Sequence, residues 1–505
     1  MKDNLIYNLG ASILTFLLTV FITFWMTPLI INNLGTEAYG FIPLTQQIIS
    51  ILSVLTFALS SVIARFLTIS ISQGNIRKAE EYFNTYLVST LFGAILIIII
   101  VMVVINKINR VLNVPDYLLI DVKLAIFFGG TLVIITFVNS LFLAGPFAMN
   151  KLYITKGIEA INAITKAIAI LLLLTIFSPK IWYINLGAMV AGAVSLITSF
   201  YFFKKLIPTV SVNFKRFNFS NLRELLSAGI WNSIGQIGVI LFLSVEIILA
   251  NIIFGASKAG VYGAMLQLPL LLRTVANITS SVFAPVIINN YASKNINSLI
   301  NYCNKSVKLN GLLIALPAAL ICGFAGVILN IWLGPEFVTH KWLLILNSAY
   351  LIVTLSPLPL NHIFTAVNKL MLPGLVTIML GVINLLLAIL LSIYTNLGLY
   401  GIVLAGAISL IGKNVIFIPI YSSVVTNQPL WKYFVGMIYP IIGAFFITIV
   451  SFILQSYFQI ISWWDLVLSG TIITIGYILF SFFLLFNKDE KSYLLNIYRA
   501  ARKRN

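Results

Sequence analysis

The stretch Ser60-Ser61-Val62-Ile63-Ala64 returns later in the chain as Ser280-Ser281-Val282-Phe283-Ala284. Single residues on both sides of it repeat at the same shift: Gly35 and Gly255, Gly40 and Gly260, Asn75 and Asn295, Tyr82 and Tyr302, and Asn84 and Asn304. Further along, the register drifts but the repeat persists in Asn150-Lys151-Leu152 and Asn368-Lys369-Leu370, Gly187 and Gly401, and Gly192 and Gly406. Self-similarity over this length predicts two related halves.

The composition places both halves in a membrane. Of the 505 residues, 60% are hydrophobic and only 9% are charged, and the mean hydropathy is +1.05. A soluble protein has about a quarter of its residues charged, so the composition excludes a soluble globular protein. Long apolar runs between short polar stretches are the pattern of a multi-span membrane protein. An internal repeat in such a protein is typical of transporters.

The apolar runs predict an all-α integral membrane protein with about fourteen transmembrane helices, because a span needs about 20 apolar residues. The predicted spans of the first half are residues 9–31, 40–64, 83–105, 122–143, 159–177 and 184–203. Those of the second half are 228–253, 261–288, 309–332, 342–365, 373–394 and 400–423, and a final hairpin follows at 434–455 and 465–486. Six spans per half give both halves one orientation, so the two lobes are expected to be pseudo-symmetric about an axis along the membrane normal.

The span positions also predict the domain organisation. The expected domains are an N-lobe at residues 1–203, a cytoplasmic inter-lobe linker at 204–227, a C-lobe at 228–423, two extra spans at 424–486 and a basic cytoplasmic tail at 487–505. The linker contains Pro208 and several basic residues, and it is the longest cytoplasmic connection in this scheme.

The charge distribution predicts the orientation. The chain has 31 Lys and Arg against 13 Asp and Glu, a net charge of +18. With the N-terminus inside, most of the basic residues fall in cytoplasmic segments, as the positive-inside rule requires, and the C-terminus is also cytoplasmic. No base-stacking aromatic platform lies beside a basic stripe, so we do not expect a nucleic-acid partner.

The sequence contains no catalytic or metal-binding constellation. The two histidines, His340 and His362, are far apart, with no cluster of cysteines or carboxylates beside them. The two cysteines, Cys303 and Cys322, are expected to be free thiols, because they support neither a disulfide framework nor a zinc site. No P-loop is present. The chain is therefore predicted not to be an enzyme, to have no catalytic or metal-binding residues, and to need no cofactor.

Charged residues inside the predicted spans are the candidate binding residues. Each costs roughly 2.5–3.5 kcal/mol at a helix centre, so each needs a reason to be there. Arg273 lies near the midplane of the eighth span, and Glu246 lies in the seventh. A short turn joins these spans, which predicts that the two side chains are neighbours. Arg273 would present a positive charge to an anionic substrate, while Glu246 would tune it or carry a coupling proton or sodium ion; a structural ion pair is the alternative.

Three other basic residues are weaker candidates. Lys166 and Lys413 lie in the inner halves of the fifth and twelfth spans, where a lysine can instead extend to the headgroups. Arg65 ends the second span, where it either guards the inner mouth of a cleft or anchors the helix end. The turns Gly35–Gly40 and Gly255–Gly260 are expected to be structural, because glycine permits tight turns and close helix approach.

At Leu34-Gly35-Thr36-Glu37-Ala38-Tyr39-Gly40, with Arg65 and the Gln73-Gly74-Asn75 loop, the sequence resembles the polysaccharide-repeat flippases. These serve pathways of the O-antigen, capsule or teichuronic type and belong to the multidrug/oligosaccharidyl-lipid/polysaccharide exporter superfamily. The resemblance covers essentially the whole chain, as a pattern more than as a strict motif. The final hairpin is similar to that of fourteen-span members, whereas drug-exporting relatives usually stop at twelve.

The resemblance implies a V-shaped pair of six-helix lobes in a bacterial cytoplasmic membrane that opens alternately to each side. It implies an undecaprenyl-diphosphate-linked oligosaccharide as the substrate. Membrane lipids and a polysaccharide polymerase are the expected partners. It also implies a central cleft lined by the first, second, seventh and eighth spans, where Glu246 and Arg273 fall. The chain departs from several relatives in having few intramembrane cations.

Three alternative functions stay open. A lipid II flippase would use the same mechanism with another cargo. A cation-coupled multidrug or metabolite exporter predicts an acidic cleft with no need of Arg273. A membrane glycosyltransferase or polymerase would need large outer loops with charged clusters, and the loops here are short.

Overall fold

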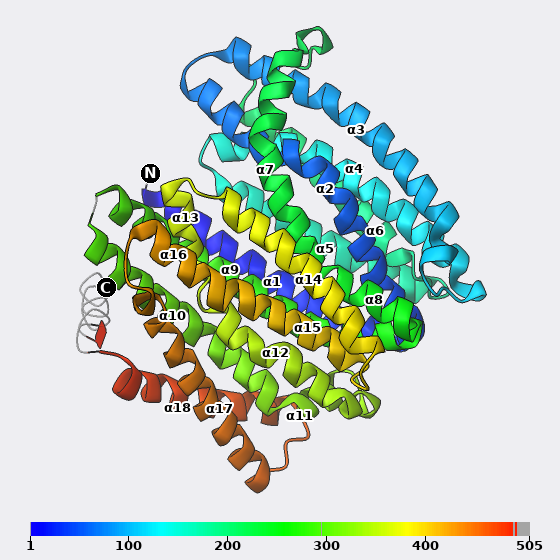
Figure 1. Cartoon of the computed structure of the whole chain (residues 1–505). Helices are drawn as coiled ribbons and strands as arrows, with labels where there is room; N and C mark the ends of the chain where they lie inside the picture. Colours follow the sequence, from blue (N-terminus) through cyan, green and yellow to red (C-terminus); the bar gives the residue numbers. More distant parts are fainter. Residues whose placement is uncertain (1, 294, 488–489, 492–505) are drawn as a thin grey trace. The chain divides into compact units, whose positions relative to one another are not determined.

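A computed structural model describes residues 2–293, 295–487 and 490–491. Its described residues form helices joined by short turns and contain no strand, which confirms the predicted all-α class (Figure 1). Among them, fourteen stretches are long and apolar enough to cross a membrane. Each coincides with one of the predicted spans, so the expected architecture, hairpin included, is confirmed. The predicted basic tail at 487–505 lies almost entirely outside the described residues.

The helices of the first half are α1 (Lys2–Leu34), α2 (Thr36–Ser72), α3 (Ile76–Val111), α4 (Leu119–Ala148), α5 (Leu152–Ile176) and α6 (Tyr183–Leu206). Those of the second half are α7 (Phe219–Leu243), α8 (Val245–Phe254), α9 (Ala256–Ala292), α10 (Ile296–Gly323), α11 (Ala325–Trp332), α12 (Lys341–Leu355), α13 (Asn361–Val367), α14 (Met371–Ile393), α15 (Leu399–Leu410) and α16 (Ile418–Thr426). The hairpin consists of α17 (Ile438–Tyr457) and α18 (Trp463–Phe480).

Several predicted spans are interrupted in the structure. The seventh span divides into α7 and α8 at Ser244, and the predicted 309–332 span ends as the separate helix α11. Prolines 357 and 359 follow α12 and lack a backbone N–H, so α12 ends before them and the chain resumes as α13. The twelfth span contains a π-helical turn, η5 (Ile411–Phe417), between α15 and α16.

The repeat is visible in the backbone. Gly35 and Gly255 end equivalent helices with φ angles of 81° and 86°, and Asn150 and Asn368 have φ angles of 53° and 58°. Glycine and asparagine are the residues that enter this left-handed region most easily. At these two repeated pairs the chain therefore makes the same unusual turn twice.

The chain divides into two compact units. Unit 1 comprises Met1–Ala264 and Met371–Gly406, and unit 2 comprises Met265–Leu370 and Ala407–Asn505. The division places α7, α8 and α14 with the first-half helices in unit 1. These units are groups of mutual contacts and not repeats, so the boundaries proposed for the N-lobe and C-lobe stay a prediction.

Each unit has its own aromatic core. In unit 1, the Phe83 ring lies 5.2 Å from that of Phe203 and 6.1 Å from that of Phe142. In unit 2, the Tyr421 ring lies 5.0 Å from that of Phe364 and 5.5 Å from that of Phe417. Such pairs stabilise helix packing beyond simple burial.

The starts of α2 and α9 approach each other backbone to backbone in unit 1. A Cβ atom on Gly40 would lie 2.6 Å from the carbonyl oxygen of Ala256 and 2.8 Å from the backbone nitrogen of Gly260. A Cβ atom on Gly260 would collide with the carbonyl oxygen of Thr36. Thr36 and Gly40, like Ala256 and Gly260, are small residues four positions apart, the spacing that lets membrane helices pack closely. The predicted structural role of these glycines fits this packing.

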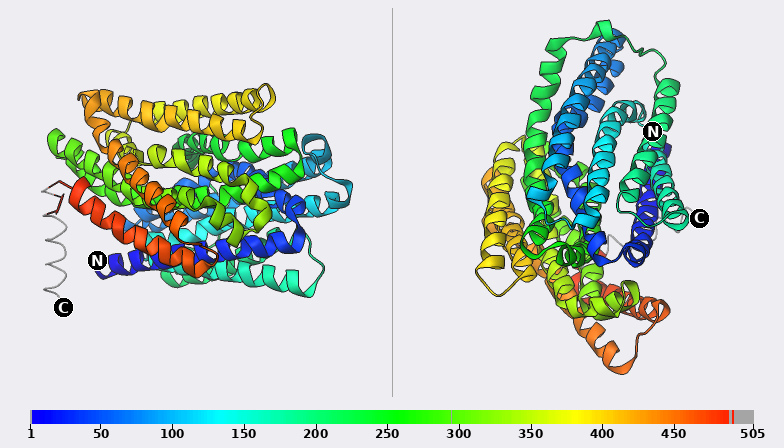
Figure 2. Two further views of the ribbon diagram at one scale, coloured as in Figure 1. Left: turned by 90° about the horizontal axis from the view of Figure 1, so that it is seen from below. Right: turned by 90° about the vertical axis from the view of Figure 1, so that its right-hand side faces the viewer.

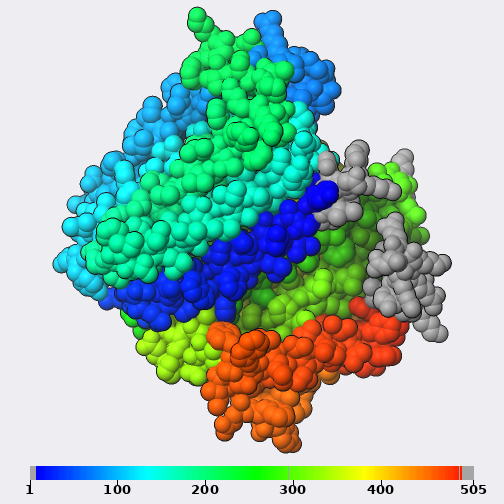
Figure 3. Space-filling view, turned by 180° about the vertical axis from the view of Figure 1, so that it is seen from behind, coloured from blue at the N-terminus to red at the C-terminus, as the bar shows by residue number. Residues whose placement is uncertain are grey.

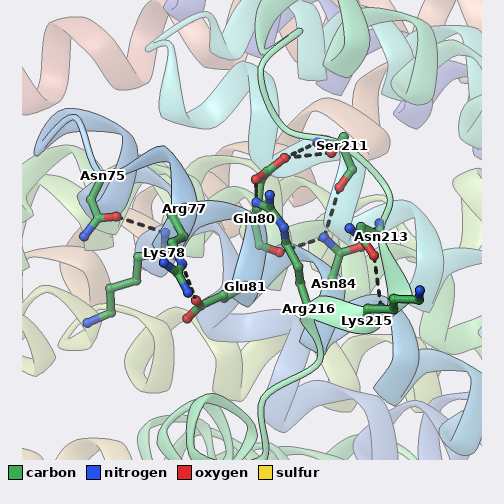
Figure 4. A network of polar contacts seen from close by, with 10 residues as sticks. All are labelled: Asn75, Arg77, Lys78, Glu80, Glu81, Asn84, Ser211, Asn213, Lys215 and Arg216. Atoms are coloured by element: carbon green, nitrogen blue, oxygen red, sulfur yellow. Dashed lines mark hydrogen bonds and ion pairs between the residues drawn. The ribbon is translucent and has the colours of Figure 1, made fainter.

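The linker after α6 is fastened to α3 (Figure 4). The Glu80 carboxylate accepts hydrogen bonds from the backbone N–H and the hydroxyl of Ser211, at 3.1 and 2.7 Å, and forms an ion pair with Arg216. The Asn84 side chain donates to the carbonyl of Ser211 at 3.0 Å and accepts from the N–H of Asn213 at 2.7 Å. Figure 2 (right) shows this green linker passing from α6 to α7 at the top of the view. These bonds hold the linker in place against α3 within unit 1.

Replacing Gly40 with alanine is expected to destabilise the protein by about 1–3 kcal/mol, the usual cost of overpacking. The added methyl group meets backbone atoms, which cannot move aside as a side chain would. The measurement is the melting temperature of the purified protein in detergent. Gly10→Ala in α1 is the matched control, because a Cβ atom there has nothing within 4 Å. Equal melting temperatures for the two variants would contradict the packing described.

Replacing Glu80 with alanine is expected to release the linker, because Ser211 and Arg216 lose their common partner. Trypsin should then cleave after Lys215 and Arg216 roughly fivefold faster, which corresponds to about 1 kcal/mol lost from local closure. The control is Glu159→Ala, which breaks only an exposed ion pair with Lys156. An unchanged cleavage rate in the Glu80 variant would show that the linker is held by other contacts.

Candidate functional site

Arg273 lies at the middle of α9 and is held by a tyrosine of α12. Its Nη2 donates a hydrogen bond of 2.7 Å to the Tyr350 hydroxyl, and its Cζ lies 5.9 Å from the centre of the Tyr350 ring. Both residues belong to unit 2, and both side chains are half-buried. The tyrosine fixes the position of the guanidinium group while leaving its positive charge intact.

A second positive charge lies near Arg273. Lys413, on the π-helical turn η5 of the same unit, is close enough for the two charges to act on each other. Bringing two like charges together in a membrane-spanning region is costly, and an anion between or beside them would offset that cost. The structure therefore brings together two of the five residues predicted from the sequence.

Buried amides hold the helices around this pair. The Asn414 side chain, next to Lys413, donates to the Thr354 carbonyl of α12 at 2.7 Å. The Asn310 side chain of α10 donates to the Leu355 carbonyl at 2.9 Å and accepts from the Thr279 hydroxyl of α9 at 2.5 Å. These bonds connect α9, α10, α12 and η5. π-Helical turns often mark functional sites, and this one positions Lys413.

An apolar groove lies along the same helix that carries Tyr350. Its volume is about 460 Å³. Its lining consists of α12 and α17 residues, which are Ala349, Ile352, Val353, Ile441, Ala444, Phe445, Thr448, Ile449 and Phe452. Helix α12 thus contributes to a cationic cluster through Tyr350 and to a groove suited to a hydrocarbon chain through the residues beside it.

Glu246 occupies a buried polar site in unit 1. Its side chain is in the first turn of α8, where the helix dipole favours a carboxylate, and the residue is only 4% exposed. The Tyr262 hydroxyl donates a hydrogen bond of 2.8 Å to its Oε2. A Cβ atom on Gly406 would lie only 2.5 Å from its Oε1, so the glycine lets the carboxylate lie against α15.

The side-chain oxygen of Asn384 lies near the same position, beside Gly406. The Cβ position of Gly406 is 3.9 Å from the side-chain oxygen of Asn384, on α14. That oxygen is buried and has no hydrogen-bond partner among the described residues. A buried oxygen of this kind needs an explanation, such as an ion or a water molecule. A carboxylate and an amide oxygen together are suited to a proton or a hard cation such as sodium.

The other predicted residues lie elsewhere in unit 1. Arg65 is an exposed residue of α2, with its guanidinium carbon 5.1 Å from the Phe66 ring. Lys166 is half-buried within α5. Glu246 and Arg273 belong to different units, so their predicted pairing, like the substrate role of all five residues, stays a prediction.

Sequence analysis missed Tyr350, Tyr262 and Asn384. Each is a polar residue inside an apolar span, which is the signal that could have identified them. Among the described residues, no three His, Cys, Asp or Glu side chains gather in a way that could hold a metal ion. Cys303 and Cys322 are free thiols, as predicted.

Comparisons with known proteins agree on one family. Residues 2–291 match the family described as "Polysaccharide biosynthesis protein". The "Uncharacterized membrane protein EpsK" of Bacillus subtilis (strain 168) is 44% identical over 495 residues, which is 98% of this chain and 98% of that protein.

Solved structures show the fold. An inward-facing multidrug resistance MATE family transporter of the MOP superfamily superposes with a TM-score of 0.64 at 16% identity, covering 84% of this chain and 99% of that one. The lipid II flippase MurJ, in an inward closed conformation, superposes with a TM-score of 0.63 at 15% identity, covering 94% of this chain and 99% of that one.

The Glu246 site predicts cation-dependent stability. A cation bound at 100 times its dissociation constant would add about 2.7 kcal/mol to the free energy of unfolding. The melting temperature should therefore be higher in sodium chloride than in choline chloride at pH 8, if sodium binds, or higher at pH 5.5 than at pH 8, if a proton binds. Glu246→Gln should abolish whichever of these melting-temperature differences the wild-type protein shows, whereas Glu159→Gln, at an exposed site, should keep it. If both differences persist in Glu246→Gln, the site does not bind a cation.

Proposed function

Because the chain belongs to the polysaccharide biosynthesis protein family, we propose that it transfers an undecaprenyl-diphosphate-linked oligosaccharide from the inner to the outer leaflet of the bacterial cytoplasmic membrane. The family and the fold make it a multi-pass, flippase-like transporter for polysaccharide biosynthesis. The proposal adds the cargo, the membrane and an orientation with both termini in the cytoplasm, which the distribution of basic residues favours.

The observation that supports this proposal is that α12 of unit 2 carries both Tyr350, which holds Arg273, and one wall of an apolar groove. A lipid-linked oligosaccharide has an anionic diphosphate between a long hydrocarbon chain and a sugar. Arg273 and Lys413 supply positive charge for the diphosphate, and charge-assisted hydrogen bonds to phosphate are strong. The groove along α12 and α17 supplies an apolar surface for the hydrocarbon chain. The sugar would travel through a water-filled path.

Alternating access is the expected mechanism. Prolines lie inside the helices predicted to line the cleft: Pro28 in α1, Pro43 in α2, and Pro269 and Pro285 in α9. Proline removes an intrahelical hydrogen bond and lets a helix bend. Such bends would allow two rigid lobes to rock about the cleft.

The Glu246 site would couple transport to an ion gradient. Its carboxylate and the Asn384 oxygen would take up a proton or a sodium ion on the outer side and release it inside. The ion gradient would then drive the alternating-access cycle, and no cofactor would be needed. A polysaccharide polymerase would be the partner that consumes the delivered oligosaccharide.

A lipid II flippase is the second candidate, because the MurJ fold covers more of this chain than the MATE fold does, 94% against 84%. It shares the anionic lipid carrier, and only the sugar differs. A multidrug exporter is favoured less by the site, since cationic drugs would be repelled by Arg273 and Lys413.

Translocation by the purified protein in liposomes tests the proposal. Arg273→Ala should lower the rate of diphosphate-linked oligosaccharide transfer at least tenfold, since a hydrogen bond to a charged group contributes about 1.5–3 kcal/mol. Arg273→Lys should retain part of the activity, and Arg273→Gln should behave as Arg273→Ala. The control is Arg77→Ala, which removes an exposed arginine of α3.

Two results would contradict the assignment. Full transport by a well-folded Arg273→Ala protein would remove the arginine from substrate binding. No transport of lipid-linked oligosaccharide by the wild-type protein, with transport of a cationic drug instead, would replace the flippase with an exporter.

A further inference from the structure

A pocket of about 390 Å³ opens in unit 1 between α5 and α6, and the transport site described above does not include it. Its polar end carries Lys151, Tyr153 and Lys205, and its apolar part includes Ile154, Ile158 and Phe202. The pocket therefore has the two-part character of a lipid, with charge at one end and hydrocarbon along its length.

Both lysines lie at one end of two neighbouring spans. Lys151 directly precedes α5, and Lys205 is in the last turn of α6. Two antiparallel helices bring these ends to the same membrane surface, which the positive-inside rule predicts to be cytoplasmic. Lipid headgroups lie at that level, and an anionic leaflet attracts basic residues near its surface.

The apolar wall continues from there into the membrane region. Ile154, Ile158 and Ile161 line the pocket and are spaced four and three residues apart, so they form one stripe along α5. Gly157 lies between them, and a Cβ atom there would meet nothing within 4 Å. The missing side chain keeps the space beside the stripe open.

The first helix holds this pocket in shape. The backbone N–H of Tyr153 donates to the Asn8 side chain at 2.7 Å, and the Thr15 hydroxyl donates to the Lys156 carbonyl at 3.0 Å. Figure 3 shows α1 in blue beside the turquoise helices of this region. The N-terminal end of α5 is therefore fixed before any ligand arrives.

The nearby carboxylate does not neutralise the two lysines. Glu159 lies about two turns into α5, and its Oε2 is 2.7 Å from the Nζ of Lys156, which already balances it. Lys151 and Lys205 thus contribute positive charge at the mouth of an otherwise apolar pocket. An anion that carries its own hydrocarbon chain satisfies both parts.

We propose that this pocket binds an anionic glycerophospholipid of the cytoplasmic leaflet. The lipid phosphate lies between Lys151 and Lys205, and one acyl chain lies along the isoleucine stripe past Gly157. The bound lipid fills the gap between α5 and α6. The proposal is independent of the cargo that the protein transports.

Native mass spectrometry of the full-length protein in detergent, titrated with phosphatidylglycerol or phosphatidylcholine, tests the proposal. Phosphatidylglycerol should bind more tightly to the wild-type protein. Lys151→Gln and Lys205→Gln should each weaken its binding about fivefold, and together more than tenfold. Lys204→Gln is the matched control, because the neighbouring Lys204 does not line the pocket. Lys151→Arg, which keeps the positive charge, should bind phosphatidylglycerol as the wild-type protein does.

A second variant tests the apolar part without changing charge. Gly157→Phe fills open space in α5, so the protein should fold and yet lose phosphatidylglycerol binding at least fivefold. The proposal is wrong if Lys204→Gln weakens binding as much as the pocket variants, or if Gly157→Phe binds the lipid normally. It is also wrong if inorganic phosphate displaces the lipid at equal concentration, or if undecaprenyl diphosphate binds more than tenfold tighter, since the pocket would then serve a free anion or the cargo.

Discussion

The close approach of α2 and α9 at Gly40 and Gly260 is the constraint on which the rest of unit 1 depends. These glycines are repeat mates, and each would drive a Cβ atom into the backbone of the other helix. Membrane helices have little hydrophobic drive to associate, so backbone proximity supplies much of their attraction. From this crossing, α9 continues through the membrane to Arg273. The packing of these two repeated glycines thus determines where α9, the helix that carries Arg273, begins.

Equivalent residues of the two halves make different contacts. Asn84 and Asn304 are repeat mates, but Asn84 fastens the linker while the side-chain oxygen of Asn304 is buried without a partner among the described residues. Glu80, the main attachment of the linker, has Ile300 at the equivalent place. The carboxylate of Glu246 lies in unit 1, whereas Arg273 and Lys413 lie in unit 2. The acidic residue and the two basic residues predicted as binding residues therefore belong to different units.

The sequence predicted the features that depend on local composition. Each of the fourteen predicted apolar spans corresponds to a stretch of the described residues that is long and apolar enough to cross a membrane. The repeat of Asn75 as Asn295 did not by itself indicate a role, and both side chains accept capping hydrogen bonds of 3.0 Å, from the N–H groups of Lys78 and Ser298. It did not predict which side chains meet, because Tyr350 reaches Arg273 across 77 positions of the chain. The division of the seventh span at Ser244 also escaped it, since no proline or glycine lies there. The π-helical turn Ile411–Phe417 is better marked, because it contains Gly412 and is followed by Pro419, which lacks the N–H that would continue a regular helix.

We propose that this chain delivers a lipid-linked oligosaccharide to the outer leaflet. The most direct test is to deplete the protein in its host and measure, leaflet by leaflet, where lipid-linked oligosaccharide accumulates. We expect accumulation on the inner leaflet together with loss of cell-surface polysaccharide. Unchanged surface polysaccharide, with increased sensitivity to cationic drugs, would contradict it and identify an exporter instead.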